Sequence, residues 1–215
     1  MFNSDPIEEF GSPASTAVRI FWILFSMLFL PAIMLKICNS SPMALLISSG
    51  FGVLGGIAPA KKLILKKINF QDLLSIACTV VIILFSVAIL TACWKFILTQ
   101  MHISYPEKQF LAKLISETNW QGRAMVFCAT CLFAPFSEEV LFRRIIYGIW
   151  QKHHPQSAFI GTAMVFSLIH FFLPGIPGLF FMGIAFQYIF LRRKNLWCAY
   201  LTHFFVNVCA FIVNI

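Results

Sequence analysis

The stretch APFSEEVLFRR, residues 134–144, places two glutamates and two arginines inside an otherwise apolar segment, 122–150. A charged side chain at the centre of a bilayer costs about 2.5–3.5 kcal/mol on insertion scales. Ionisable residues at such depth usually face the interior of a helix bundle and mark a functional site. The stretch therefore predicts a buried helix that carries polar chemistry, and the surrounding sequence indicates a membrane protein.

The whole chain has the composition of an integral membrane protein. Of its 215 residues, 60% are hydrophobic and only 11% are charged, whereas soluble domains average about 25% charged residues. The net charge of +8 fits basic loops that face the cytoplasm and anionic lipid head groups better than it fits nucleic acid. The expected partner is thus the lipid bilayer, with no nucleic acid.

Apolar segments long enough to approach a bilayer crossing recur along the chain, because a spanning helix needs about 20 mainly apolar residues. We expect an all-α fold, a polytopic membrane helix bundle with about seven transmembrane helices. The predicted spans are 17–37, 43–60, 73–99, 122–150, 156–173, 178–191 and 196–215. The segment 102–118 is polar enough to be an external loop or a surface helix, and Gly52 and Gly56 form a G-x-x-x-G typical of close helix packing.

These spans divide the chain into a cytoplasmic N-terminal tail (1–16), N-terminal membrane helices with the external loop (17–121), and catalytic membrane helices (122–215). With seven spans, three basic runs fall on one side of the membrane. The positive-inside rule makes that side the cytoplasm, with the N-terminus inside and the C-terminus outside. The runs are Lys61, Lys62, Lys66 and Lys67; Arg143, Arg144 and Lys152; and Arg192, Arg193 and Lys194.

Few strongly polar side chains remain within the spans, and their spacing is regular. Glu139 and Arg143 lie four residues apart, on one helix face, so Arg143 can neutralise Glu139. Glu138 is rotated by about 100° on the same helix and can point elsewhere. His203 and Asn207 repeat the four-residue spacing, as do Phe166 and His170.

The turn near His154 and Pro155 predicts that Glu138 faces His170. Each of these two residues is 16 positions from His154, so antiparallel helices of equal rise bring them to one level. His203 lies near the start of the last span and would sit roughly 12 Å shallower if all loops ended at one height. We therefore expect the hairpin at His154 to project beyond the other turns.

Each polar pair also has a purely structural interpretation. Glu139 and Arg143 can be a buried ion pair, and His170 can be a hydrogen-bonded core histidine. His203 and Asn207 can form an interhelical hydrogen bond, worth about 0.6 kcal/mol on average in membranes. Taken together on three helices, however, the residues provide the carboxylate, imidazole and neutral donor that water activation requires.

The ordered motifs E-E-x-x-x-R, F-x-x-x-H and H-x-x-x-N resemble those of the CAAX-protease and bacteriocin-processing (CPBP) family of intramembrane glutamic-type endopeptidases. Flanking residues agree, among them Pro135 and Phe142 in APFSEEVLFRR and the run FMGIAFQYIFLRRKNLWCAYLTHFFVN. The resemblance covers about 130–209. It departs from the family at Arg144, where glycine is common.

The resemblance implies a multi-spanning α-helical fold and endopeptidase activity with no cofactor and no required metal. By resemblance, Glu138 and His170 would activate the hydrolytic water, and His203 and Asn207 would stabilise the oxyanion. Glu139 and Arg143 would shape and neutralise the site, with Phe166 in support. The substrate would be a membrane-associated protein or peptide, and the location a bacterial cell membrane.

Two alternatives stay open at this point. Glu138, His170 and His203 could ligate Zn²⁺ with an open fourth position, as in a metalloprotease, although no H-E-x-x-H is present. Intramembrane charges also mark proton relays, so a non-catalytic immunity or transport protein is a further reading. The identity of the substrate, prenylated or not, and the oligomeric state cannot be read from the sequence.

Overall fold

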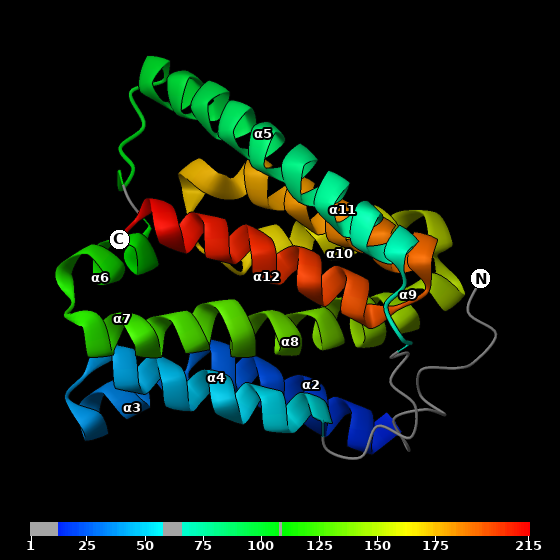
Figure 1. The fold of residues 1–215 in the computed structure, drawn as a ribbon, viewed down its shortest axis with the longest axis horizontal. Helices are drawn as coiled ribbons and strands as arrows, with labels where there is room; N and C mark the ends of the chain where they lie inside the picture. Colours follow the sequence, from blue (N-terminus) through cyan, green and yellow to red (C-terminus); the bar gives the residue numbers. More distant parts are fainter. Residues whose placement is uncertain (1–12, 58–65, 108) are drawn as a thin grey trace.

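The structure is a computed structural model that describes residues 13–57, 66–107 and 109–215, and every regular element in these ranges is a helix (Figure 1). The predicted all-α bundle of membrane helices is therefore confirmed. The α-helices are α2 (Pro13–Leu28), α3 (Leu30–Cys38), α4 (Ser41–Ile57), α5 (Phe70–Gln100), α6 (Phe110–Glu117), α7 (Trp120–Phe127), α8 (Ala134–Glu139), α9 (Tyr147–His153), α10 (Pro155–Leu168), α11 (Ile176–Arg193) and α12 (Leu196–Val213). The π-helices η1 (Cys128–Phe133) and η2 (Val140–Ile146) and the 3₁₀-helix η3 (Leu173–Gly175) complete the fold.

One continuous helix, Trp120–His153, runs through the middle of the bundle. Helices α2–α4 lie on one side of it, and α5 and α10–α12 lie on the other (Figure 1). Asn119 caps its start by accepting a hydrogen bond from the amide of Gly122 at 2.9 Å. Pro135 has no amide hydrogen to donate to the preceding turn, and η1 ends just before it. The two π-helices flank α8, which carries the paired glutamates.

Four helices are long and apolar enough to cross a membrane by length and composition: Phe70–Gln100, Trp120–His153, Leu173–Arg193 and Leu196–Val213. The pair α2 and α3, bent by 49°, makes a fifth if it counts as one span. The described residues thus support four or five crossings, fewer than the seven predicted. The reason is that α4 has 17 residues and α10 only 14.

The predicted order of helices is nevertheless present, and successive long helices run in alternating directions (Figure 1). The start of α5 and the turn between α11 and α12 lie together, because the side chain of Asn195 makes two hydrogen bonds to the backbone of Lys66. Arg193 also pairs with Asp72 there. Lys61, Lys62 and most of the tail 1–16 lie outside the described residues.

The turn at His154 is present, between α9 and α10. In Figure 1 this turn extends beyond the start of α12, as the depth argument required. The G-x-x-x-G in α4 also packs closely. A Cβ on Gly52 would lie 3.3 Å from the hydroxyl of Ser137, and one on Gly56 would lie 3.7 Å from Val140, so both glycines face the central helix.

Candidate active site

The paired glutamates of α8 are buried and contact a histidine from α12. Glu139 is fully buried, and its Oε2 accepts a hydrogen bond from Nε of Arg143 at 2.9 Å. Its other oxygen, Oε1, lies 2.9 Å from Nδ1 of His203. The pair expected from the four-residue spacing is therefore present, and Glu139 also joins α8 to α12.

Glu138 approaches the opposite side of the same imidazole. Its Oε2 lies 3.8 Å from Nε2 of His203, while both side chains are almost entirely buried. Oε2 of Glu138 has no hydrogen-bond partner among the described residues. His203 thus lies between two carboxylates, one of which holds its ring by a hydrogen bond while the other remains available.

Three phenylalanines surround the guanidinium of Arg143. Its Cζ lies 5.8 Å from the ring centroid of Phe142, 5.1 Å from that of Phe166 and 5.8 Å from that of Phe186. Such cation–π contacts contribute about 0.5–2 kcal/mol each, more when the cation is removed from water. Phe186 also stacks on His203, with centroids 4.5 Å apart. The rings hold the cation and the imidazole in place and exclude water from behind them.

His170 lies just past the last turn of α10. Its Nδ1 is 2.7 Å from the backbone oxygen of Phe166. A carbonyl oxygen can only accept a hydrogen bond, so Nδ1 carries the proton and Nε2 of the neutral ring keeps its lone pair. The hydrogen bond to the backbone expected for a core histidine is present, yet His170 is only half-buried and lines a cavity.

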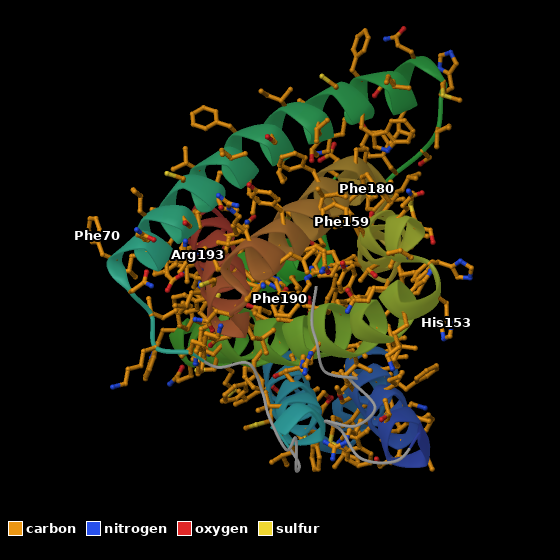
Figure 2. The ribbon with its side chains drawn as sticks, turned by 90° about the vertical axis from the view of Figure 1, so that its right-hand side faces the viewer. Phe70, His153, Phe159, Phe180, Phe190 and Arg193 are labelled. Atoms are coloured by element: carbon orange, nitrogen blue, oxygen red, sulfur yellow. The ribbon has the colours of Figure 1, made fainter. Side chains whose placement is uncertain are left out.

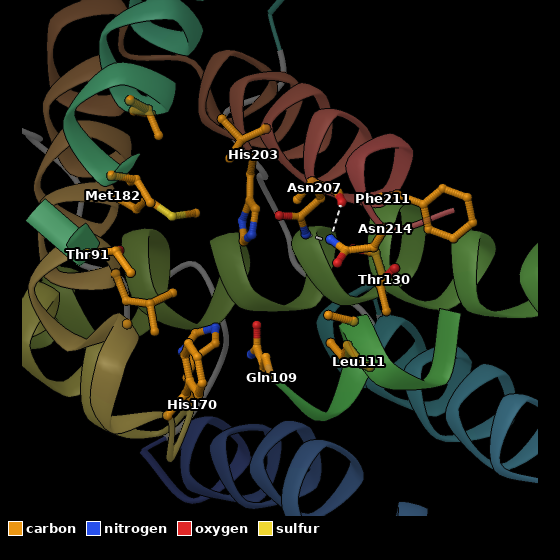
Figure 3. A pocket seen from close by; sticks show the side chains of 18 of the residues that line it. Thr91, Gln109, Leu111, Thr130, His170, Met182, His203, Asn207, Phe211 and Asn214 are labelled. Atoms are coloured by element: carbon orange, nitrogen blue, oxygen red, sulfur yellow. Dashed lines mark hydrogen bonds between the residues drawn. The ribbon is translucent and has the colours of Figure 1, made fainter. Parts of the chain in front are cut away.

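That cavity has a volume of about 450 Å³, and it is lined by Glu138, His170, His203 and Asn207 (Figure 3). Asn207 donates a hydrogen bond from Nδ2 to the backbone oxygen of Thr130 at 2.8 Å, so η1 fixes its amide while a second amide hydrogen remains. The structure therefore brings these four predicted residues together. Glu139, Arg143 and Phe166 lie behind them and support them.

The walls of the cavity are mostly apolar and come from α5, α6, α11 and α12. Among the lining residues are Ile83, Val87, Leu111, Ile115, Leu179, Met182, Val206 and Phe211. Glu138 and His170 share this cavity, and their predicted direct partnership stays a prediction. Across the described ranges, no group of three or more His, Cys, Asp and Glu side chains is arranged to hold a metal ion.

Several residues at the site escaped the sequence motifs. Phe186 had no signal beyond its place in an apolar run, because stacking on His203 requires the tertiary packing of α11 on α12. The hydrogen bond from Asn207 to the backbone oxygen of Thr130 could not be predicted, because every residue type has the same backbone oxygen. Gln109 lines the cavity from the segment before α6 and lies outside every motif.

Comparison with known proteins finds a family model that matches the part of the chain that carries these residues. Residues 120–209 match the family model described as "Type II CAAX prenyl endopeptidase Rce1-like". The match begins with the central helix and includes every motif residue, so the resemblance to the CPBP family is confirmed over this segment.

A curated relative agrees. The chain is 24% identical over 96 residues to the protein named "Putative membrane peptidase YdiL" from Bacillus subtilis (strain 168). The alignment covers 44% of this chain and 39% of the length of that relative. No solved structure matches the chain. Helices α2–α6 lie outside the range of the family match.

Proposed function

We propose that this chain is an intramembrane endopeptidase that hydrolyses a peptide bond of a membrane-associated protein or peptide. The observation that carries the proposal is that Glu138 from α8, His170 from just past α10, and His203 and Asn207 from α12 line one cavity with apolar walls. The match of residues 120–209 to an endopeptidase family supports the same reaction.

Glu138 and His170 are proposed to activate the water. Oε2 of Glu138 is a buried acceptor without a hydrogen-bond partner in the described chain, and Nε2 of His170 keeps a lone pair. A water held between them transfers a proton to Glu138 as its oxygen attacks the peptide carbonyl carbon. The same proton then passes to the leaving amine. A positioned general base contributes typically about 10²–10⁴-fold to the rate.

His203 and Asn207 are proposed to stabilise the oxyanion. Nδ1 of His203 lies 2.9 Å from Oε1 of Glu139, and Nε2 of the same ring lies 3.8 Å from Oε2 of Glu138. Glu139 thus holds the ring with Nε2 directed toward the carboxylate that is proposed to activate the water. Nε2–H of His203 and the remaining amide hydrogen of Asn207 then donate to the developing oxyanion.

The test compares membranes that contain the wild-type protein with membranes that contain Glu138→Gln, by mass spectrometry of peptide termini. Glutamine keeps the shape of Glu138 and removes the base, so we expect new peptide ends with the wild type and none with the variant. Both proteins should accumulate equally. The matched control is Glu117→Gln on the exposed side of α6, which should retain the ends. Identical termini with all three proteins would refute an endopeptidase.

Metal dependence is part of the proposal and needs its own measurement. We propose a metal-independent, glutamic-type reaction. Protein purified in detergent and treated with a chelator should keep its activity, and metal analysis should find no stoichiometric zinc. Activity that is lost on chelation and restored by Zn²⁺ would replace this mechanism with a metalloprotease using Glu138, His170 and His203.

The orientation is also proposed. The N-terminus is proposed to lie in the cytoplasm of a bacterial cell, because α9 and α11, whose last turns carry Lys152 and Arg192, end toward the same side of the bundle (Figure 1). Reporter fusions at Asn195 and Ile215, before and after α12, should report opposite sides, with Asn195 inside. The same side for both fusions would contradict this topology.

A further inference from the structure

We propose that Gln109 is a substrate-positioning residue, and that its carboxamide hydrogen-bonds the backbone of an extended substrate segment inside the cavity. This inference rests on the proposed endopeptidase function and adds a residue from outside the matched range 120–209. Figure 3 shows the carboxamide of Gln109 pointing into the cavity beside His170, with His203 and Asn207 across from it.

Within the described residues, the carboxamide of Gln109 does not cap its own helix. Gln109 occupies the N-cap position of α6, where its backbone oxygen accepts a hydrogen bond from the amide of Lys113 at 3.2 Å. N-cap side chains normally bind the first free amides of the helix, but the side chain of Gln109 makes no such bond. The backbone of Gln109 is extended, with ψ of 148°, and the side chain lines the cavity instead (Figure 3).

Helix α6 itself forms a wall of the same cavity. Leu111, Ala112 and Ile115 line it, while Lys113 and Glu117 are exposed on the other side of the helix. Side chains from neighbouring helices hold the segment through its backbone. Arg123 donates from Nε to the oxygen of Ile115 at 3.1 Å, and Lys95 donates from Nζ to the oxygen of Glu107 at 3.3 Å. Gln109 therefore lies at the edge of a cavity wall that is attached to α5 and to the central helix.

The chemistry of the substrate explains why a carboxamide is useful here. A peptide bond that is exposed for hydrolysis has left the helical conformation, so its neighbouring N–H and C=O groups lose their intrahelical partners. Water is scarce at this depth, and each unpaired backbone group costs several kcal/mol in hydrocarbon. A carboxamide offers both a donor and an acceptor, so one glutamine can pair with both groups of an extended chain.

Two other polar side chains that line the cavity already make hydrogen bonds within the protein. Asn214 donates from Nδ2 to the oxygen of Ala210 at 2.7 Å, and the hydroxyl of Thr130 donates to the oxygen of Val126 at 2.8 Å. Asn207 and the two histidines serve the reaction. Gln109 is thus the carboxamide best placed to hold the substrate chain next to the scissile bond.

The experiment uses a peptide that the wild-type protein has been shown to cleave, with the full-length protein in detergent. Gln109→Met keeps the length of the side chain and removes its hydrogen-bonding groups. We expect KM to rise about tenfold, the effect of losing about one hydrogen bond, while kcat stays within about twofold. The matched control Gln121→Ala, at an exposed glutamine of α7, should leave both constants unchanged.

A second readout does not depend on turnover. In the Glu138→Gln background, a photo-crosslinking amino acid at position 109 should capture the peptide, and the same group at position 121 should not. Wild-type cleavage with unchanged KM for Gln109→Met would overturn the role of Gln109 and leave the endopeptidase intact. A fall in kcat at constant KM, or equal crosslinking from positions 109 and 121, would overturn it as well. If the search for a substrate finds no peptide that the wild type cleaves, that result would instead refute the proposed function.

Discussion

Helix α5 and the central helix Trp120–His153 are similar in length but opposite in character. Helix α5 has 31 residues, a mean hydropathy of 2.9 in its most apolar window, and 11% of that window buried. The central helix has 34 residues, a mean hydropathy of 1.5 and 56% buried. Figure 2 shows Phe70 of α5 pointing away from the bundle, where it is exposed. The most hydrophobic helix therefore faces outward, and the less hydrophobic one carries the site.

The difference teaches that depth in the bundle, and not hydropathy, determines where charges are tolerated. Glu138, Glu139, Arg143 and Arg144 are all buried in the central helix. They are covered by neighbouring helices on both sides (Figure 1), and α5 contributes only a wall of the cavity. Substitutions on the two helices should therefore have very different consequences.

The largest effect is expected for Arg143→Ala. The substitution leaves the buried carboxylate of Glu139 without its counter-ion, and breaking a buried pair typically costs about 3–5 kcal/mol. Thermal unfolding in detergent should show a large loss of stability, together with loss of activity similar to that of Glu139→Ala. Lys95→Ala on α5 is the comparison, because Lys95 makes one exposed hydrogen bond and its loss should change stability by less than about 0.5 kcal/mol. If Arg143→Ala changed neither stability nor activity, the ion pair would not be important for the protein.

A smaller effect is expected where α4 meets the central helix. A Cβ on Gly52 would lie 2.9 Å from the hydroxyl of Ser26 and 3.3 Å from that of Ser137. Both hydroxyls are buried and donate to backbone oxygens, so they cannot yield freely. We expect Gly52→Ala to lower the free energy of unfolding by about 1–3 kcal/mol.

Gly50→Ala is the matched control on the same helix. A Cβ at Gly50 meets nothing within 4 Å, and alanine favours a helix over glycine by about 1 kcal/mol. This variant should be neutral or slightly stabilising in the same unfolding measurement. Equal losses from both alanines would show that the contact between α4 and α8 is not close.

The smallest effect is expected for Phe85→Leu on α5. Phe85 is 69% exposed on the outer face. Lipid chains can contact leucine there as well as phenylalanine, because both side chains are apolar. Stability should change by less than about 0.5 kcal/mol. Phe186→Leu, which removes the ring stacked on His203, should instead lower activity clearly. Equal activities for the two variants would contradict the claim that α5 faces outward while Phe186 supports the site.

The sequence predicted the helical class, the order of the helices and the Glu139–Arg143 pair, because each depends on local periodicity or composition. It also predicted a turn near His154, which lies between α9 and α10. The number of crossings was overestimated for the described residues, since α4 has 17 residues there and α10 only 14. Helix ends depend on caps and turns more than on hydropathy.

Details of the site were harder to foresee. The spacing of Glu138 and Glu139 indicated that they point in different directions, but only the packing of α8 on α12 shows that His203 lies between them. The π-helices η1 and η2 around α8 leave no pattern in the residue types. Gln109 could not be found because its approach to His170 depends on how a polar connecting segment folds back over the bundle.

The hydrogen bond between Glu139 and Arg143 has a consequence for how the protein enters the membrane. Because the two residues are four apart on one helix, their charges can cancel as soon as that helix forms, before any other helix arrives. The helix can therefore enter the lipid with the charges of Glu139 and Arg143 already paired. His203 and the phenylalanine rings then join a helix in which this pair is already neutral, so assembly of the bundle does not have to bring the charges of Glu139 and Arg143 through hydrocarbon unpaired.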